Sequence, residues 1–179
     1  MYRKSEDKVF QLEMKRGKVP LPSLESYYLI DQTTGYIKIN RFSQTTYDEF
    51  DTVLNDLISK GMLKLILDLR DNPGGYLLPA KQISNALLEK DQTIVVTQSN
   101  IGEKEKSKAD GNGIFQEGEL IVLVNEQTAS ASEIVAGAVQ DNDRGWIIGR
   151  RTFGKGLVQQ QMPLGGGDAV RLTIAKYFT

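Results

Sequence analysis

The sequence predicts an α/β domain with a largely parallel sheet and flanking helices, to which antiparallel strands are added. Two observations indicate this class. Apolar, strand-like runs alternate with helix-like stretches through the middle of the chain, a pattern typical of parallel sheets. Near both ends, strand-like runs follow one another across short Gly-containing turns, which favours antiparallel pairs. With 179 residues, the chain is long enough for one domain with a substantial core.

Each element follows from a local pattern. Alternating apolar residues and β-branched runs predict strands, whereas apolar residues three and four apart predict helices. Thr46 and Glu49 have the spacing of a capping box at the start of the first helix, and Gly61 is expected to end it. The predicted elements are strands at 27–30, 36–39 and 63–69, a helix from 46 to Gly61, a helix at 78–88, strands at 93–97 and 120–124, a helix at 134–139, and strands at 146–149, 157–162 and 169–175.

Two segments fall outside this alternation. Residues 9–14 alternate loosely and predict a strand, which basic residues and a Pro20-Leu21-Pro22 link follow. Residues 98–118 are charged, contain glycine and show no periodicity. A stretch of this length inside a domain is typical of a functional lid or of a disordered segment.

The composition excludes several kinds of chemistry. The chain has no histidine and no cysteine, so it can build no Ser-His-Asp triad, no thiolate nucleophile and no His or Cys metal site. A formal net charge of −1 gives no indication of nucleic-acid binding, and no apolar run approaches the ~20 residues that span a membrane. Any general base that acts near neutral pH must therefore be Lys, Asp, Glu or Tyr.

Three hydroxyl side chains, on Thr128, Ser130 and Ser132, lie between a predicted strand and the helix that follows it. A hydroxyl at a helix N-terminus can be a cap, or a nucleophile beside N–H groups that favour negative charge. Without histidine or cysteine, a serine can still be activated by a neutral lysine, and Lys155 lies between two glycines beside Phe153. The residue types alone do not choose among the three hydroxyls.

Two adjacent glycines, Gly74 and Gly75, directly follow Asn72-Pro73 after the predicted strand at 63–69. As structure alone, this segment is a turn. However, α/β domains bind ligands at the carboxyl ends of parallel strands. Adjacent glycines let backbone N–H groups approach a ligand closely, as an oxyanion hole requires.

Two further segments have the spacing of known ligand-binding loops but lack residues that those loops require. Residues 149–156 have the spacing of a phosphate-binding loop, but Gly156 replaces the Ser or Thr that holds magnesium, and a strand rather than a helix follows. Residues 141–145 resemble the start of a calcium loop, yet Gly145 and Thr152 stand at positions that need oxygen-rich ligands. Asp141 is therefore expected at a helix end or in a supporting position.

Three blocks of sequence together resemble the C-terminal processing (tail-specific) serine protease family. They are DLRDNPGG at 68–75, TASASEIVAGA at 128–138 and TFGKGLVQ at 152–159, within a likeness that covers roughly residues 36–177. The resemblance implies a crotonase-like core. It also implies these roles: Ser130 as nucleophile, Lys155 as general base, Gln159 as the residue that orients the lysine, backbone N–H groups of Ala131 and of Gly74 or Gly75 as the oxyanion hole, and Glu133 and Asp141 as supporting acids.

The resemblance also predicts domain organisation and function. Residues 1–22 would be the terminal strand of a truncated PDZ-like domain with its linker, and 23–179 a catalytic core that relatives extend beyond Thr179. The implied activity is a periplasmic or otherwise extracytoplasmic serine endopeptidase that cleaves near the C-terminal tails of protein substrates, without a metal or cofactor, and can be oligomeric. Two alternatives stay open: a non-catalytic binding module on the same fold, and an acyl-CoA enzyme of the crotonase type, which would leave the Ser130 and Lys155 blocks unexplained.

Overall fold

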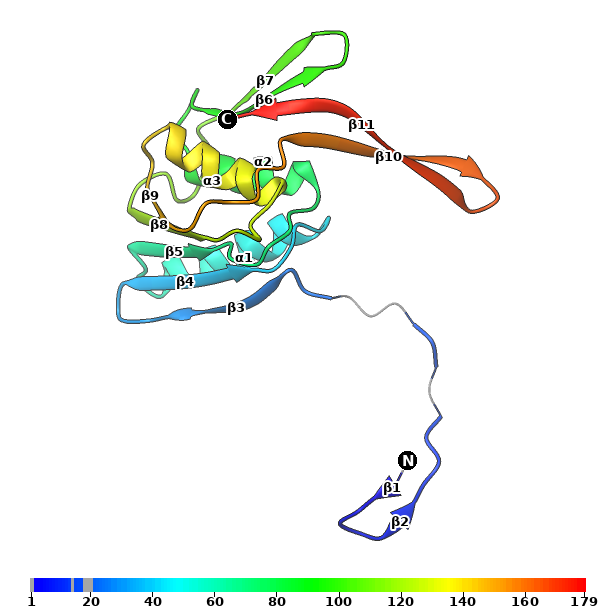
Figure 1. Cartoon of the computed structure of the whole chain (residues 1–179). Coiled ribbons are helices and arrows are strands. Elements are labelled where there is room, and N and C mark those ends of the chain that lie inside the picture. Colours follow the sequence, from blue (N-terminus) through cyan, green and yellow to red (C-terminus); the bar gives the residue numbers. More distant parts are fainter. Residues whose placement is uncertain (1, 14, 18–20) are drawn as a thin grey trace.

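A computed structural model describes residues 2–13, 15–17 and 21–179 (Figure 1). The described part of the chain forms a five-stranded sheet, a four-stranded sheet, three helices and a short N-terminal strand pair. The elements in chain order are β1 (Tyr2–Arg3), β2 (Lys8–Val9), β3 (Leu24–Leu29), β4 (Thr34–Ile39), α1 (Thr46–Ser59), β5 (Lys64–Asp68), α2 (Leu77–Leu87), β6 (Thr93–Ser99), β7 (Lys104–Lys108), β8 (Glu119–Val124), α3 (Ala131–Asp141), β9 (Trp146–Gly149), β10 (Leu157–Gly165) and β11 (Asp168–Phe178).

The five-stranded sheet has the order β3-β4-β5-β8-β9. The pairs β4–β5, β5–β8 and β8–β9 are parallel, and β3 is added antiparallel to β4. Burial alternates along β4, β5 and β8, because successive side chains of a strand point to opposite faces. The core-facing positions are Ile37, Ile39, Leu65, Leu67, Leu120 and Val122, each 1% exposed or less. The predicted parallel α/β core is therefore confirmed.

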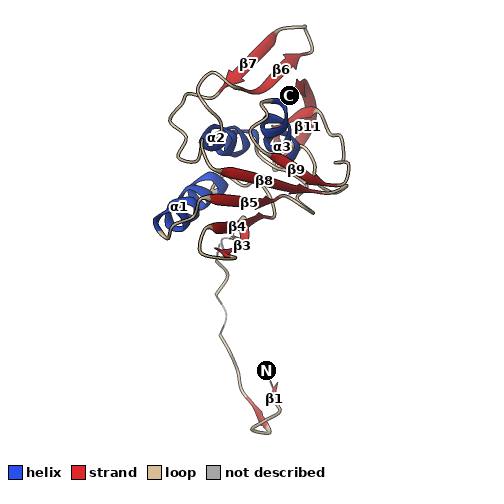
Figure 2. Cartoon of the chain, turned by 90° about the vertical axis from the view of Figure 1, so that its left-hand side faces the viewer, coloured by secondary structure: helices blue, strands red, loops and turns tan. Residues whose placement is uncertain are grey.

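The four-stranded sheet has the order β10-β11-β6-β7 and is antiparallel throughout. Helices α2 and α3 lie between the two sheets in both views (Figure 2). A second apolar cluster joins α2 and α3 to this sheet through Leu88, Ile94, Val95, Ala109, Ile134, Ala138 and Tyr177. The second half of the chain therefore places β10 and β11 next to the N-terminus of α3.

Helix α1 ends as its sequence predicts but begins differently. Gly61 has φ +97°, and the N–H groups of Gly61 and Met62 donate to Ile58 and Leu57, which is the Schellman arrangement at a helix C-terminus. The predicted capping box at Thr46 and Glu49 is wrong. Thr46 lies inside the first turn, and the Glu49 carboxylate instead accepts the Ser23 N–H (2.7 Å), which binds the helix to the start of β3.

Two further predictions are corrected. The segment at 98–118 is not a structureless loop, because β7 lies within it and pairs with β6. The predicted strand at 9–14 is confined to Val9 within β2, while residues 10–13 have no regular structure and Met14 lies outside the described residues. Pro20 of the predicted link also lies outside them. Over the described residues, no helix has the length and apolar character to cross a membrane.

Candidate active site

The turns that follow β5 and β8 are bound together at the carboxyl ends of these parallel strands. The Asn125 side chain donates to the Asp71 carboxylate (2.8 Å) and accepts the Asp71 N–H (3.0 Å). The Ala129 N–H donates to the Asn72 carbonyl (3.0 Å). Two segments far apart in sequence, 71–75 and 125–130, therefore form one rigid platform at the edge where α/β proteins bind ligands.

The structure separates the three hydroxyls of this platform. Thr128 is fully buried, and its Oγ1 donates to the Leu69 carbonyl (2.8 Å). Ser132 is fully buried as well, and its Oγ donates to the Asn72 carbonyl (3.2 Å). Ser130 alone is partly exposed and lines a cleft. Thr128 and Ser132 hold the platform together, and Ser130 is the one of the three hydroxyl residues that lines the cleft.

Ser130 has an unusual backbone conformation. Its φ of 57° and ψ of −115° lie in a region that residues other than glycine rarely adopt, at a cost on the order of 1–3 kcal/mol. It stands at the sharp turn between β8 and α3, where the same kind of strained turn presents the nucleophile of other hydrolases. The Glu133 side chain accepts the Ser130 N–H (2.7 Å), and Ser130 and Glu133 together form a capping box at the start of α3. Ser130 thus stands at the N-cap position of α3 and lines the cleft at the same time.

The two glycines of the turn after β5 differ in whether their N–H groups already donate a hydrogen bond. The Gly74 N–H donates to the Asn72 Oδ1 atom (2.9 Å), so it is already committed. The N–H groups of Gly75 and Ala131 have no acceptor among the described residues, and both residues line the cleft beside Ser130. Of the two glycines predicted for the oxyanion hole, Gly75 is the better donor.

Lys155 and Gln159 line the same cleft as Ser130. The Lys155 Nζ atom donates to the Gln159 Oε1 atom (3.3 Å), four positions along the chain at the start of β10. Lys155 is half-buried, and within the described residues its ammonium group has no hydrogen bond to Ser130 Oγ. The structure therefore places Lys155, the predicted base, and Gln159, the residue predicted to orient it, in the same cleft as Ser130. It shows no hydrogen bond between the Lys155 and Ser130 side chains.

Glu133, on the first turn of α3, connects the serine to the lysine loop. Its carboxylate accepts the N–H groups of Ser130 (2.7 Å), Gly154 (2.6 Å) and Lys155 (2.9 Å). Three N–H bonds to one carboxylate satisfy most of its acceptor sites. The predicted supporting role of Glu133 thus has a specific geometric basis. Asp141, by contrast, lies exposed at the opposite end of α3, away from the cleft.

Tyr177, near the end of β11, also contacts the site, although no sequence motif indicates a role for it. Its side chain is 9% exposed, and its hydroxyl group lies within hydrogen-bond reach of the carbonyls of Ser130 (2.9 Å) and Lys155. Burial, and then the Glu133 charge, raise the pKa of Tyr177 well above its usual value. In the sequence it resembles any aromatic residue of a core strand.

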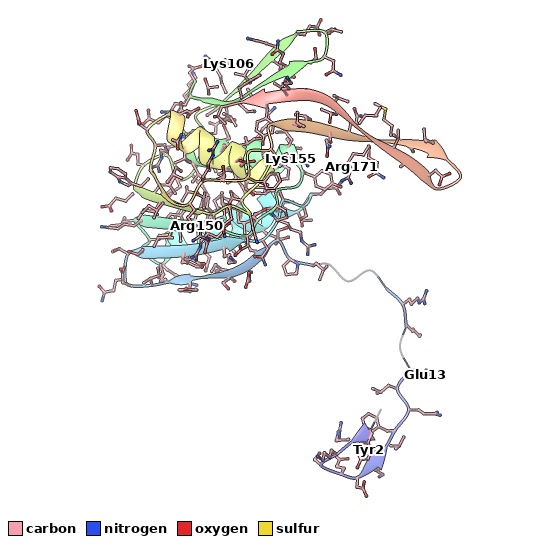
Figure 3. The ribbon with its side chains drawn as sticks, in the orientation of Figure 1. Tyr2, Glu13, Lys106, Arg150, Lys155 and Arg171 are labelled. Carbon is pink, nitrogen blue, oxygen red and sulfur yellow. The ribbon has the colours of Figure 1, made fainter. Side chains whose placement is uncertain are left out.

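The cleft occupies about 710 Å³ between the glycine turn, α3 and the β10–β11 hairpin. Apolar side chains line part of it, namely Tyr76, Leu77, Leu78, Ile134, Leu157 and Val158. Gln161 and Arg171, which are direct partners across β10 and β11, line another part. Figure 3 shows Lys155 at the base of this hairpin and Arg171 farther along it. Over the described residues, Arg171 has no acidic partner, and no acidic cluster could hold a metal ion.

Asp68 lies at the end of β5, outside the cleft that Ser130 lines. Its buried carboxylate accepts hydrogen bonds from Arg70 (2.6 Å) and from the Tyr36 hydroxyl (2.6 Å) on β4. Burial opposes ionisation, but the Arg70 and Tyr36 bonds outweigh it and lower the pKa of Asp68. Burial and the bond to Asp68 raise the pKa of Tyr36 to about 12.

Comparison with known proteins places this site in a protein family. The model of "Peptidase family S41" matches residues 33–179. The carboxyl-terminal-processing protease of Synechocystis is 44% identical over 148 residues, which are 83% of this chain and 34% of that protein. The carboxy-terminal processing protease CtpA of Bacillus subtilis is 38% identical over 168 residues, or 94% of this chain and 36% of that protein.

Solved structures agree with this assignment. The photosystem II D1 C-terminal processing protease superimposes with a TM-score of 0.78 at 32% identity, covering 94% of this chain and 46% of that one. An S41 protease from Bacteroides fragilis shares the fold, with a TM-score of 0.77 at 17% identity over 90% of this chain and 47% of that one. The chain thus spans about a third of the length of the curated relatives named above. The chain belongs to peptidase family S41.

Proposed function

We propose that this chain is the catalytic core of a serine endopeptidase that acts near the C-terminal tails of proteins. The observation that carries the proposal is the placement of Ser130. It is the one accessible hydroxyl of three, it stands on a strained turn, and it shares a cleft with a lysine that Gln159 orients. The name of one relative, a probable CtpA-like serine protease of Staphylococcus haemolyticus that is 34% identical over 170 residues, supports the serine type.

The geometry supports a Ser-Lys mechanism in two halves. Neutral Lys155 takes the proton of Ser130 Oγ while the oxygen bonds to the scissile carbonyl carbon. The N–H groups of Gly75 and Ala131 then stabilise the negative oxygen of the tetrahedral intermediate. Lys155 returns the proton to the leaving amine as the C–N bond breaks. Water, deprotonated by Lys155, releases the acyl group from Ser130.

A movement of the lysine toward Ser130 completes this arrangement. Lys155 Nζ is hydrogen-bonded to Gln159 Oε1 and must turn toward Ser130 Oγ to accept its proton. Its side chain has rotatable bonds for this change, and hydrogen bonds of catalytic groups often tighten only with substrate present.

Arg171 supports the assignment of C-terminal tails as substrates. It lines the cleft without an acidic partner among the described residues, opposite Gln161. Gln161 is two strand positions, or about 7 Å, beyond Gln159, which contacts the catalytic lysine. An extended peptide cut at Ser130 can therefore place its terminal carboxylate on the Arg171 guanidinium a few residues after the cleaved bond.

Removal of individual hydroxyls tests the nucleophile. Ser130→Ala is expected to abolish both peptide cleavage and labelling by a fluorophosphonate probe, with the fold intact by circular dichroism. Ser132→Ala removes a buried hydrogen bond instead and is expected to keep labelling while losing about 1 kcal/mol of stability. Labelling of the Ser130→Ala protein would contradict the assignment, and an unlabelled wild-type protein would favour the non-catalytic alternative.

Paired peptides test the tail assignment. Two peptides of one sequence, ending in a free carboxylate or in an amide, are compared for cleavage. We expect the free acid to have about tenfold higher kcat/KM and Arg171→Gln to remove that preference while leaving the amide peptide unchanged. Lys106→Gln, on β7 of the same sheet but outside the cleft, is the charge-matched control. Equal cleavage of both peptides by the wild-type protein would contradict the role of Arg171.

The proposal extends to the domain organisation and the cellular location of the protein. We propose that residues 1–22 belong to a PDZ-like domain and that the protein works outside the cytoplasm. Several relatives are named as chloroplastic proteins, which is consistent with work in a compartment other than the cytosol. Cell fractionation with an antibody to the chain tests the location directly.

A further inference from the structure

Two side chains hold both backbone groups of Ser130 and both backbone groups of Lys155. The Glu133 carboxylate accepts the N–H of each residue, at 2.7 and 2.9 Å. The Tyr177 hydroxyl contacts the carbonyl of each residue. Glu133 comes from α3 and Tyr177 from β11, so these two contact sets arise from different elements. We call this pair the Glu133–Tyr177 clamp.

The clamp acts where the backbone is least stable by itself. Ser130 holds a positive φ that costs on the order of 1–3 kcal/mol and persists only if the surroundings fix it. Its N–H and C=O groups lie on either side of the Cα atom whose side chain carries the reactive oxygen. Fixing both groups fixes the direction of the Cα–Cβ bond. The Ser130 carbonyl also accepts the N–H groups of Glu133 (2.9 Å) and Ile134 (3.1 Å), so the Tyr177 hydroxyl adds the contact that comes from outside α3. We expect loss of this contact to let the turn relax and to move Oγ relative to the N–H groups of Gly75 and Ala131.

Lys155 depends on the clamp for another reason. Lys155 lies two residues before β10, and its neighbour Gly154 is exposed with no atom within 4 Å of the position where a Cβ would stand. Packing alone therefore does not fix this part of the loop. Its backbone contacts to Glu133 and Tyr177, and the nearby bond from the Phe153 N–H to the Thr128 carbonyl, are what tie it to the serine platform.

We propose that Tyr177 is a positioning residue of the Ser-Lys site: its hydroxyl bridges the carbonyls of Ser130 and Lys155 and, opposite Glu133, holds nucleophile and base in register. The inference rests on the proposed function for its catalytic meaning, but not for the existence of the clamp. A phenol suits this position because its ring packs in the apolar cluster around Ile134 and Ala138, while its hydroxyl reaches the two carbonyls.

Tyr177→Phe tests the proposal, because it removes one oxygen and keeps the ring. We expect serine acylation by a fluorophosphonate and kcat for a peptide to fall on the order of tenfold to a hundredfold, with KM within about twofold. The matched control is Tyr36→Phe, which removes a 2.6 Å hydrogen bond to buried Asp68 outside the cleft. This control should lose thermal stability but acylate at the wild-type rate.

The possible results distinguish a positioning role of Tyr177 from a general loss of stability and from failure of the proposed function. Wild-type acylation in Tyr177→Phe, or an equal loss in Tyr36→Phe, overturns the positioning role. If the wild-type serine is unreactive, the proposed function fails, and amide hydrogen exchange then tests the clamp by itself. Exchange at Ser130, Gly154 and Lys155 that is faster in Tyr177→Phe than in Tyr36→Phe supports it, and unchanged exchange overturns it.

Discussion

At the scale of single residues, position 74 requires glycine, because both its backbone conformation and the neighbouring atoms disfavour a Cβ. Its φ is +90°, and a Cβ at this position would lie 2.5 Å from the Ala129 carbonyl oxygen and 2.8 Å from the Ala131 nitrogen. Atoms at such distances must shift. They belong to the backbone on either side of Ser130, so the turn after β5 directly determines where the nucleophile stands. Asn72 adds to this constraint by accepting the Gly74 N–H.

A pair of alanine substitutions separates these two effects. Gly74→Ala and Gly102→Ala share a φ of +90°, but no atom lies within 4 Å of a Cβ at Gly102. Both variants bear the backbone strain, and only Gly74→Ala adds a clash, so it should lose about 1–3 kcal/mol more. Urea unfolding of both variants measures the difference. Equal losses of unfolding free energy in the two variants would mean that the backbone around Ser130 shifts to accommodate the added Cβ at little cost.

The residue types alone could narrow the chemistry but not complete the site. The lack of histidine and cysteine limits a general base near neutral pH to Lys, Asp, Glu or Tyr, and the glycine turn indicates backbone donors. The choice among Thr128, Ser130 and Ser132 needed either the family resemblance or the burial of each hydroxyl. Tyr177 could not be found this way, because its role depends on two carbonyls that lie 47 and 22 positions away in sequence.

At the scale of elements, predictions succeeded where periodicity and packing agree. The buried strands β5 and β8 and the helices α1 and α2 carry apolar residues at the expected spacing. Strand β7 was missed because it is an exposed edge strand of the sequence KEKSK, so it has no alternating apolar signal. The capping box failed because Glu49 meets the backbone of Ser23, a contact between elements that no local pattern encodes.

At the scale of the whole molecule, Asp68 couples stability to pH. Its pKa is lower in the folded protein than the value near 3.9 in an unfolded chain. The ionised form is thus favoured by folding, so this contribution is fully present above about pH 4 and is lost as the pH falls through the folded-state pKa. The stabilising partners, Arg70 and Tyr36, lie on the turn after β5 and on β4.

A substitution at this carboxylate makes the coupling measurable. Asp68→Asn should lower the unfolding temperature at pH 7 and make it less sensitive to pH between about 5 and 2 than in the wild-type protein. Asp168→Asn, at the exposed start of β11, is the control and should leave the acid dependence unchanged. An equally steep acid dependence in the Asp68→Asn protein would show that other carboxylates control it.

The two-sheet architecture also has a consequence for the synthesis and folding of this chain. Ser130 follows β8 of the five-stranded sheet, whereas Lys155 precedes β10 of the four-stranded sheet, and Tyr177 on β11 contacts the carbonyls of both. Contacts this distant in sequence form late in folding, after their elements exist. A growing or half-folded chain therefore carries serine and lysine on separate pieces. Under the proposed mechanism, Ser130 and Lys155 therefore meet only after β11 has docked, and cleavage by this pair is delayed until the two sheets have come together.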